Sequence, residues 1–313
     1  MAKSKSGAPV LNFKAAPVRV RVPATSANLG PAFDAAGLAL DMYDEVIAQI
    51  LDEPTIEIDI AGEGADELPR DGKHLIAKSM MIAFEAMGEK PKGLAIVSAN
   101  QIPHGRGLGS SSAAIVGGIV LARSLVVGGE QILSNEAALK LASEIEGHPD
   151  NVAATLLGGF TIAWGGQESA QALQLKPHRD LRAVVCIPST AVATKKARGL
   201  LPEMISHQDA AFNAGRSALL VSAITDHPEL LLTATEDKLH QNARKSAMPK
   251  SHALMTKLRN KGHAAVISGA GPTVLVLTTG FVSEEIAKIA GDDFETIQLG
   301  ISSVGAHQVT LNA

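Results

Sequence analysis

Apolar positions in the first half of the chain alternate in short runs or recur with helical spacing. Val18 to Val22 alternates and stops at Pro23, which predicts a strand that ends in a loop. The same patterns predict strands at Tyr43–Leu51, Thr55–Ile60 and Gly93–Ala99, and helices at Leu75–Met87, from Ser110 to about Val127 and from Ser134 to Glu146. Loops are expected before the second helix, at Pro103 to Gly109, and after the third, at Gly147 to Asn151.

The second half closes with a regular order of elements. Strands are expected near Phe160–Trp164 and Leu181–Ile187, followed by helices at Asp209–Thr225 and Ser251–Lys261. A strand at Ala264–Ser268, a Gly-Ala-Gly-Pro turn, a strand at Thr273–Leu277, a helix at Ser283–Ala290 and a last strand complete the chain. This order predicts a mixed sheet with helices on one face, an α+β fold rather than a doubly wound one.

The Gly165-Gly166 pair predicts a boundary between two domains, residues 18–165 and 166–313. The first 17 residues carry lysines but no continuous apolar run, so they predict a flexible N-terminal tail rather than a secretory signal. The longest apolar stretch, Ala113 to Ala122, has about half the length that a membrane span needs. The protein is therefore expected to be cytoplasmic, with no membrane partner.

Composition narrows the class of protein further. Hydrophobic residues make up 46% and charged residues 19% of the 313 positions, which favours packed cores over disorder. A net charge of −4 and only 3% aromatic residues argue against a nucleic-acid partner. The single cysteine, Cys186, lies in an apolar run and is interpreted as a buried thiol. It excludes an intramolecular disulfide and a zinc site built on several cysteines.

The clearest chemical pattern is the run Pro103-His104-Gly105-Arg106-Gly107-Leu108-Gly109-Ser110-Ser111-Ser112-Ala113. Glycines allow the backbone to approach a ligand closely, and the helix that follows presents unpaired N–H groups and the positive end of its dipole. Hydroxyl groups in the first turn can bind phosphate oxygens or Mg²⁺. No Lys-Ser/Thr pair follows a glycine, so this is not a Walker A loop. The spacing alone fits a triphosphate site and a plain connection to a helix equally well. The three consecutive serines favour the triphosphate site, since one serine is enough to cap a helix.

Three segments together resemble the GHMP kinases (galactokinase, homoserine kinase, mevalonate kinase and phosphomevalonate kinase). They are, in chain order, Pro23-Ala24-Thr25-Ser26-Ala27-Asn28-Leu29-Gly30-Pro31-Ala32-Phe33-Asp34, the glycine-rich run, and Ser268-Gly269-Ala270-Gly271-Pro272-Thr273. The first departs from the family pattern at Ala32, where glycine is usual. The resemblance implies a two-domain fold with an N-terminal nucleotide-binding domain and a C-terminal ferredoxin-like domain, and it implies ATP and Mg²⁺ as cofactors.

The first segment is similar to the homoserine-kinase version of the motif, and three further stretches resemble the same subfamily: Glu146 to Ala153, Thr194 to Arg198, and Leu239-His240-Gln241 with Arg244. This implies transfer of phosphate from ATP to the terminal hydroxyl of L-homoserine, a step of threonine biosynthesis. A homodimer is compatible with the resemblance. Alternatives are a mevalonate or L-threonine kinase, or a non-catalytic binding protein of the same fold. A dehydrogenase is disfavoured because no acidic residue ends a strand about 20 residues after the glycines.

The resemblance also implies roles for the residues that would hold the acceptor. Arg198 and Arg244 would bind its carboxylate, since guanidinium makes bidentate charged hydrogen bonds. Asp34 would bind the ammonium group, and His148 would line the same pocket.

Other residues are expected to act on the hydroxyl and the phosphate. Asn28 and Asn151 can both donate and accept, so either can orient the hydroxyl. Asn151 is favoured, with Thr194 near the transferred phosphate, and Asp150 is left open as a general base. The resemblance implies that Mg²⁺ binds at Ser111 and Glu144, with Glu146 as the competing carboxylate.

Overall fold

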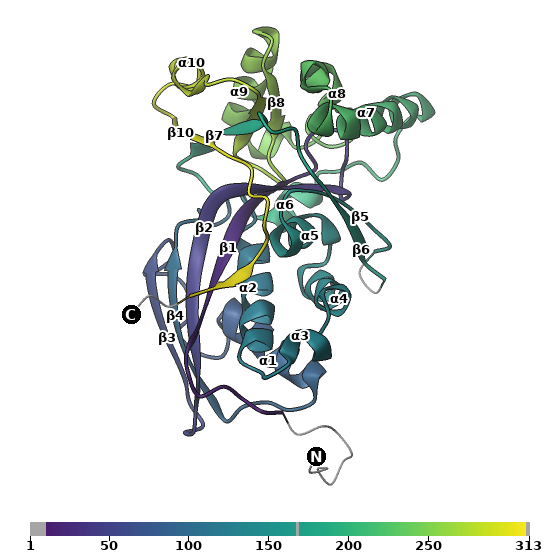
Figure 1. The fold of residues 1–313 in the computed structure, drawn as a ribbon. Coiled ribbons are helices and arrows are strands. Elements are labelled where there is room, and N and C mark those ends of the chain that lie inside the picture. Colours follow the sequence, from purple (N-terminus) through teal and green to yellow (C-terminus); the bar gives the residue numbers. More distant parts are fainter. Residues whose placement is uncertain (1–10, 167–168, 311–313) are drawn as a thin grey trace.

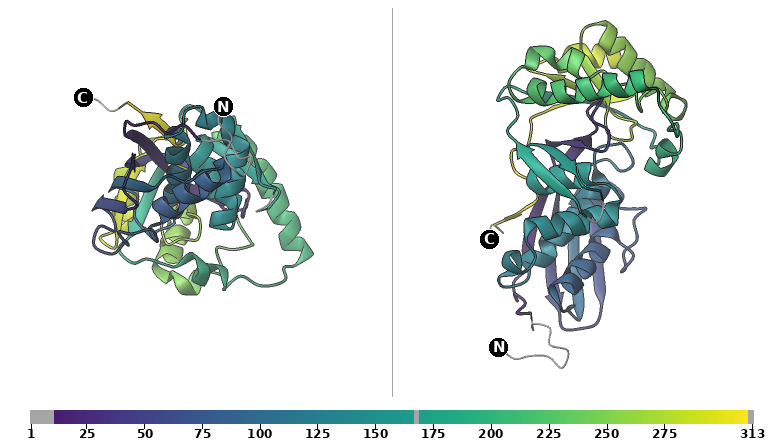
Figure 2. Two further views of the ribbon diagram at one scale, coloured as in Figure 1. Left: turned by 90° about the horizontal axis from the view of Figure 1, so that it is seen from below. Right: turned by 90° about the vertical axis from the view of Figure 1, so that its right-hand side faces the viewer.

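The computed structural model describes residues 11–166 and 169–310, which form two sheets with their helices, one unit above the other (Figure 1). No helix in this part of the chain is long and apolar enough to cross a bilayer. The two further views show that the first unit carries its helices together on one side of its sheet (Figure 2).

The first sheet has the strand order β11-β1-β2-β4-β3 among the described residues, and β5 and β6 continue it from β2. Within the described ranges, only β3 and β4 pair in parallel, joined through the crossover helix α1. The strands are β1 (Val18–Ala27), β2 (Ala36–Leu51), β3 (Ile56–Gly62), β4 (Gly93–Asn100), β5 (Phe160–Trp164), β6 (Gln171–Leu175) and β11 (His307–Val309).

Strand β1 continues past Pro23, contrary to the prediction that it stops there. Pro23 pairs with Tyr43, whereas the next residue, Ala24, pairs with Leu40, so β2 bulges at this point. Proline lacks the N–H that a regular ladder uses and is tolerated at such an irregularity. The extension places Thr25, Ser26 and Ala27 in the strand, directly before the loop that starts at Asn28.

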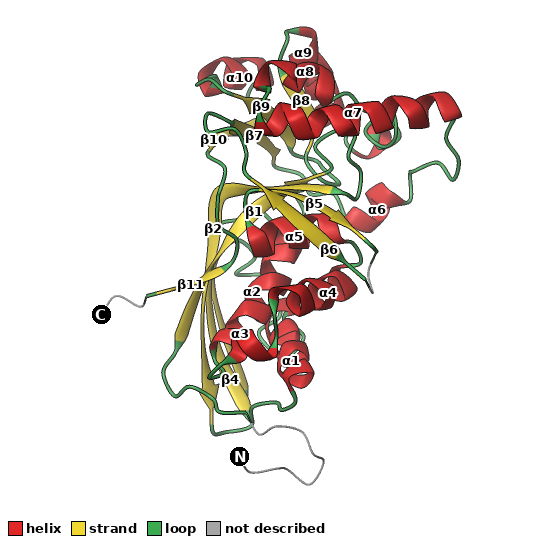
Figure 3. Ribbon diagram, turned by 45° about the vertical axis from the view of Figure 1, so that its right-hand side comes forward, coloured by secondary structure: helices red, strands yellow, loops and turns green. Residues whose placement is uncertain are grey.

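Helices cover one face of this sheet, as Figure 3 shows. The central one is α2, which contacts α1, α4, α5 and β1 and is buried along most of its length. An apolar pattern on all sides is typical of such a helix. The helices are α1 (Leu75–Met87), α2 (Ser110–Ser124), α3 (Gly129–Ile132), α4 (Asn135–Glu146) and α5 (Pro149–Leu157). The predicted loop Gly147 to Asn151 in fact contains the start of α5, where proline occupies the first turn.

The second sheet is antiparallel in the order β10-β7-β9-β8, with β7 (Arg182–Pro188), β8 (Ala264–Ile267), β9 (Val274–Thr278) and β10 (Phe294–Leu299). Numbered along the chain this is the order 4-1-3-2, which confirms the ferredoxin-like arrangement and the α+β class. Its helices are α6 (Thr194–Arg198), α7 (His207–Thr225), α8 (Leu231–Ala234), α9 (Pro249–Asn260) and α10 (Ser283–Ala290). Two single 3₁₀ turns, Pro228–Leu230 and Lys245–Ala247, connect them.

The prediction that helices cover one face of this sheet is wrong. Val184 and Cys186 pack with residues of α9 and α10, whereas the alternate residues Ala183 and Val185 belong to the main core, together with Leu220 of α7. Strands covered on both faces appear in the sequence as continuous apolar runs, as β8 and β9 do.

The last part of the predicted N-terminal tail, residues 11–17, is held against the first unit. Leu11 is buried, and Phe13 meets the edge of the Phe84 ring at 5.7 Å between centroids. Burial of these apolar side chains fixes residues 11–17 against the first unit, and residues 1–10 lie outside the described part. The domain boundary near residue 165 stays a prediction. The first sheet takes β6 and β11 from beyond that point.

Candidate active site

A cavity of about 160 Å³ lies where the glycine-rich loop, the first-motif loop, α5, α6 and the turn before β9 meet. Its walls contain most of the residues that the sequence predicts: Asn28, Gly105, Gly107, Gly109, Ser110, Ser111, His148, Asp150, Asn151, Thr194, Arg198 and Arg244. Glu146, Gly269 and Ala270 complete the lining. Segments as distant as residues 28 and 269 are joined there, because Asn28 Nδ2 donates to the Gly269 carbonyl at 2.9 Å.

The glycine-rich loop is held in one conformation by the neighbouring motifs. Gly105, Gly107 and Gly109 all have left-handed backbone angles, with φ of 63°, 77° and 74°. The Ser268 hydroxyl donates to the Gly107 carbonyl at 2.6 Å, and Thr25 N–H donates to the Leu108 carbonyl at 3.0 Å. Gly109 then caps α2, so the loop delivers its backbone to the positive end of a helix at the cavity.

The predicted nucleotide residues do not all face this cavity. Arg106 donates to the backbone carbonyls of Pro188, Ser189 and His104, so its guanidinium ties the loop to the end of β7. Leu108 is fully buried in the core. Neither Pro103 nor Ser112 lines this cavity, and His104 and Ala113 lie instead at a second, adjoining cavity.

Substitution of Gly109 by alanine should raise the KM for ATP by about tenfold, which corresponds to about 1.4 kcal/mol. A Cβ atom there would lie 2.1 Å from Thr25 Oγ1, so the loop must shift. Gly128→Ala is the matched control, because Gly128 also caps a helix with φ of 71°, yet its Cβ would meet nothing closer than 3.6 Å. Steady-state kinetics on both folded variants check this, and equal ATP KM values would contradict it.

Glu146, not Glu144, is the acidic residue beside the serines that follow the glycine-rich loop. Its Oε1 accepts from Ser111 Oγ at 2.6 Å and from Ser112 Oγ at 3.1 Å. Glu144 lies two positions earlier on α4, about 200° around the helix, where it is exposed and absent from the cavity wall. The preference for Glu144 is thus corrected to Glu146.

The Ser111 and Glu146 oxygens are hard donors of the kind that Mg²⁺ takes, so the residues present fit this ion. No group of three or more His, Cys, Asp or Glu side chains able to hold a metal occurs in the described ranges 11–166 and 169–310. A cation at this place would therefore depend on few protein ligands, as Mg²⁺ does when phosphate and water supply the others.

His148, Asp150 and Asn151 form a linked group at the start of α5. Asp150 is 1% exposed, and its Oδ1 accepts from His148 Nδ1 at 2.6 Å and from Asn151 N–H at 2.8 Å. Burial lowers the pKa of His148, but the hydrogen bond to Asp150 and the charges of Asp150 and Glu146 outweigh burial, so this pKa is raised. Asn151 Oδ1 accepts from Thr25 Oγ1 at 2.9 Å, which leaves its NH₂ group for the cavity.

The first-motif loop brings the predicted acceptor residues together in pairs. Asn28 Oδ1 accepts from Asp34 N–H at 2.9 Å, so the amide of Asn28 closes the loop at the same time as it binds Gly269. Arg198 donates to both Asp34 oxygens, at 2.9 and 2.6 Å, and both side chains are one-third exposed. Asp34 itself lines a neighbouring open cavity with His148. The anion and the cation expected to bind the acceptor therefore bind each other here.

Arg244 lies in the wall of the same cavity and is 1% exposed. Its guanidinium carbon lies 5.4 Å from the centre of the Phe33 ring, and that of Arg198 lies 5.5 Å from the same ring. Contact with an aromatic face favours both cations at this distance. Two guanidinium groups thus converge on one aromatic side chain at the wall of the cavity.

A second cavity, of about 250 Å³, adjoins the first through Ser110 and Ser111. Apolar side chains dominate it, among them Val46, Leu68, Leu75 and Ile76. Asp44 lies in its wall and accepts from Gln101 and Ile102 N–H at 2.7 and 2.9 Å, while burial raises its pKa to about 6. A flat apolar group attached to phosphates at the glycine loop would fit this position.

Sequence reasoning missed roles for Thr25, Phe33 and the Gly269-Ala270 turn, although all lie in segments singled out by their motifs. Thr25 holds Asn151 and limits the space at Gly109. Phe33 lies beneath both arginines. Their positions within the motifs were the available signal, and their contacts depend on residues far away in the chain.

Known proteins are similar to this chain over nearly all of its length. The pattern described as GHMP kinases N terminal domain matches residues 74–159. Two proteins named homoserine kinase, from Streptomyces coelicolor and Streptomyces avermitilis, are each 56% identical to it, over 94% and 96% of this chain and 95% and 98% of theirs. The crystal structure of homoserine kinase from Cytophaga hutchinsonii has a TM-score of 0.80 at 26% identity, covering 96% of this chain and 99% of that one. The chain therefore belongs to the GHMP kinase family, within its homoserine kinase group.

Proposed function

We propose that the chain transfers the γ-phosphate of ATP to the terminal hydroxyl of L-homoserine, releasing O-phospho-L-homoserine and ADP. The observation that carries this is the convergence, in one cavity, of the glycine loop, Asn151 and two arginines. The relatives named homoserine kinase support the same reaction. Activity in threonine biosynthesis follows from this product.

ATP would lie across the two cavities. The adenine base would occupy the apolar cavity beside Val46 and Leu68, and the phosphates would meet the backbone of Gly107 and Gly109 at the start of α2. Ser111 and Glu146 would hold Mg²⁺, and this ion would neutralise part of the triphosphate charge when bound. Charge at this position matters because phosphoryl transfer depends mainly on positioning and electrostatic stabilisation.

L-Homoserine would lie between Asp34 and the two arginines. The ion pair of Asp34 with Arg198 satisfies both groups in the absence of substrate. A zwitterionic amino acid offers each of them a group of opposite charge, so its ammonium can replace Arg198 at Asp34 while its carboxylate binds guanidinium. Arg244 is already fixed in the wall and can meet the carboxylate with little loss of side-chain entropy.

The acceptor hydroxyl would then lie near Asn151 and Thr194. The Asn151 NH₂ can donate to the hydroxyl oxygen, which turns the O–H away from it and holds the oxygen toward the phosphate. Asp150 could instead take the proton, since its Oδ2 has no hydrogen-bond partner among the described residues and the residue lines the cavity. We favour Asn151 as the orienting group. We also expect the enzyme to be cytoplasmic and to form a homodimer.

Asn151→Ala and Asp150→Asn separate these two routes. If Asn151 orients the hydroxyl, Asn151→Ala should lower kcat by about tenfold to a hundredfold and raise the homoserine KM far less. Asp150→Asn should retain more activity, because the amide keeps the shape beside His148. Steady-state kinetics with the homoserine concentration varied provide both kcat and KM. A near-complete loss of kcat in Asp150→Asn, with Asn151→Ala mild, would show that Asp150 is a general base.

Product identification tests the proposed function. Incubation with Mg·ATP and L-homoserine should give ADP and O-phospho-L-homoserine in equal amounts, with the phosphate on the terminal oxygen by phosphorus NMR. ATP hydrolysis without phosphorylated homoserine would contradict the proposal.

A further inference from the structure

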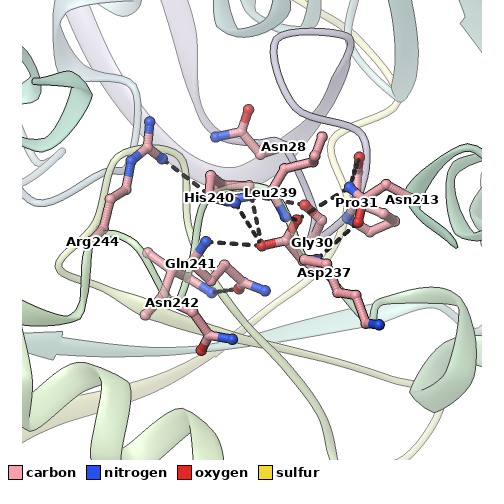
Figure 4. Close-up of polar contacts among 12 residues, drawn as sticks. Asn28, Gly30, Pro31, Asn213, Asp237, Leu239, His240, Gln241, Asn242 and Arg244 are labelled. Carbon is pink, nitrogen blue, oxygen red and sulfur yellow. Dashed lines mark hydrogen bonds and ion pairs between the residues drawn. The ribbon is translucent and has the colours of Figure 1, made fainter. Parts of the chain in front are cut away.

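A buried polar network lies behind Arg244, and the chemistry described so far does not use it. Figure 4 shows Arg244 at one end and Asn213 of α7 at the other, with His240 and Asp237 between them. The network also reaches the backbone of the first-motif loop at Gly30 and Pro31. It therefore joins the segment that carries one acceptor residue, Arg244, to the loop that carries another, Asp34.

The two hydrogen bonds of His240 fix the state of its ring. Nε2 lies 2.8 Å from the Gly30 carbonyl oxygen, which can only accept, so Nε2 carries a proton. Nδ1 lies 3.1 Å from Arg244 Nη1, and an arginine can only donate. Nδ1 must therefore be unprotonated and accept from Arg244, which makes the imidazole neutral. Burial lowers the pKa of His240, in agreement with this state.

The hydrogen bonds of Arg244 leave one side of its guanidinium for a ligand. Nη1 donates to His240 Nδ1 and to the Gly269 carbonyl at 3.2 Å, so both of its hydrogens are used. Nε donates to the Ala197 carbonyl at 3.3 Å. Among the described residues Nη2 has no hydrogen-bond partner, and Arg244 lines the active-site cavity. His240 thus supplies one of three anchors that set the plane of the guanidinium.

Asp237 accepts hydrogen bonds from the backbone of the turn that carries His240. Its side chain is 0% exposed, and its two oxygens accept from the backbone N–H groups of Leu239, His240 and Gln241 at 2.8, 3.1 and 2.8 Å. A carboxylate that accepts several backbone hydrogen bonds fixes the turn that contains them. The ring position of His240 is therefore set by the fold rather than by contact with solvent.

The first-motif loop is tied to the same network. Asn213 Nδ2 donates to the Pro31 carbonyl at 2.9 Å and to Asp237 Oδ1 at 3.2 Å. The Phe33 ring lies 5.3 Å from the His240 ring and adjoins Asp34 in the chain. Movement of His240 would consequently change the position of the Arg244 guanidinium relative to the loop that carries Asp34.

We infer that His240 is a positioning residue for the acceptor: by accepting from Arg244 while it donates to Gly30, it fixes the guanidinium at the distance from Asp34 that a zwitterionic α-amino acid requires. Because Arg244 is assigned to the acceptor carboxylate, the inference rests on the proposed function. His240 itself touches neither the acceptor nor the nucleotide in this arrangement.

Two variants separate the two hydrogen bonds of His240. In His240→Asn the amide oxygen can occupy the Nδ1 position and accept from Arg244. In His240→Gln the amide nitrogen can occupy the Nε2 position and donate to Gly30, but the acceptor for Arg244 is lost. His252→Gln is the matched control, since His252 bonds to Asn242 away from both cavities. The KM values for homoserine and ATP are measured for each variant, and thermal melting confirms that each is folded.

His240→Gln should raise the homoserine KM by about tenfold and leave the ATP KM within roughly threefold of the wild-type value. His240→Asn should keep both values near those of the wild type, as should His252→Gln. Unchanged homoserine KM in His240→Gln would overturn the inference. Equal rises for homoserine and ATP, or equal rises in both His240 variants, would also overturn it, because they indicate only a general structural role. A wild-type protein that does not phosphorylate homoserine would overturn the proposed function, and the inference with it.

Discussion

Replacing Arg244 with alanine should raise the homoserine KM by about thirtyfold to a thousandfold while the ATP KM stays close to the wild-type value. The range corresponds to about 2–4 kcal/mol for the loss of charged hydrogen bonds from Nη2, the guanidinium nitrogen that has no hydrogen-bond partner among the described residues. Arg244 is buried and anchored on three sides, so the wild-type guanidinium needs little ordering when the carboxylate binds. Steady-state kinetics with each substrate varied in turn provide the measurement.

Two further variants test whether the effect of Arg244→Ala is specific to its guanidinium group. Arg244→Lys should recover little, because an ammonium group has no second nitrogen that could bond His240 and Gly269 while the first one meets the carboxylate. Arg259→Ala is a control for the loss of a largely buried arginine, since Arg259 donates to Thr235 Oγ1 and to the carbonyls of Ala265 and Leu232 outside the cavity. It should lower thermal stability and leave the homoserine KM unchanged. A normal homoserine KM in Arg244→Ala would place the carboxylate site elsewhere.

Glu146→Gln should lower kcat by roughly a hundredfold at fixed Mg²⁺ and shift half-saturation to higher Mg²⁺. The amide keeps the shape of the side chain and its oxygen can still accept from Ser111, but the negative charge that attracts the cation is lost. Glu144→Gln is the matched control, because it removes the same charge from the exposed side of the same helix. Its kcat should stay close to the wild-type value.

A binding measurement separates the metal role of Glu146 from a general loss of activity. Calorimetry with ADP should show that Mg²⁺ strengthens binding less in Glu146→Gln than in the wild type, and that both proteins bind ADP similarly in EDTA. The opposite pattern, with Glu144→Gln impaired and Glu146→Gln normal, would restore the residue that the sequence favoured. Full turnover of the wild type after chelation would show that neither Glu146 nor Glu144 acts through a metal ion.

Local sequence patterns predicted most elements and the order of the three motifs. The structural effects of glycine and of apolar periodicity extend over only a few residues, so a short stretch of sequence contains them. They failed where a distant contact decides the local structure. Pro23 stops a strand in most contexts, yet here it falls at a bulge in β2, so β1 continues to Ala27. Leu11 and Phe13 belong to a segment with the composition of a tail, and they are held by a core that the sequence alone does not place nearby.

In the site, too, local motifs identified residues, whereas contacts between distant residues could not be predicted. The family motifs brought Asn151, Arg198 and Arg244 to attention, and the structure places all three in one cavity. The choice between Glu144 and Glu146 depended on which side of α4 faces the glycine-rich loop, and two residues along a helix change the side by about 200°. The role of His240 depends on a hydrogen bond to Gly30, 210 residues away in the chain. Composition and spacing carry no signal for such a contact.

The most direct test of the central claim is a coupled ADP-release assay with four acceptors: L-homoserine, L-threonine, L-serine and mevalonate. We expect kcat/KM to be highest for homoserine, because both its charged groups and its terminal hydroxyl match the cavity. Serine, one methylene shorter, should be lower by about tenfold to two-hundredfold. Mevalonate lacks the ammonium group that Asp34 would bind and should give no release above background. Turnover of mevalonate with none of homoserine would contradict the account.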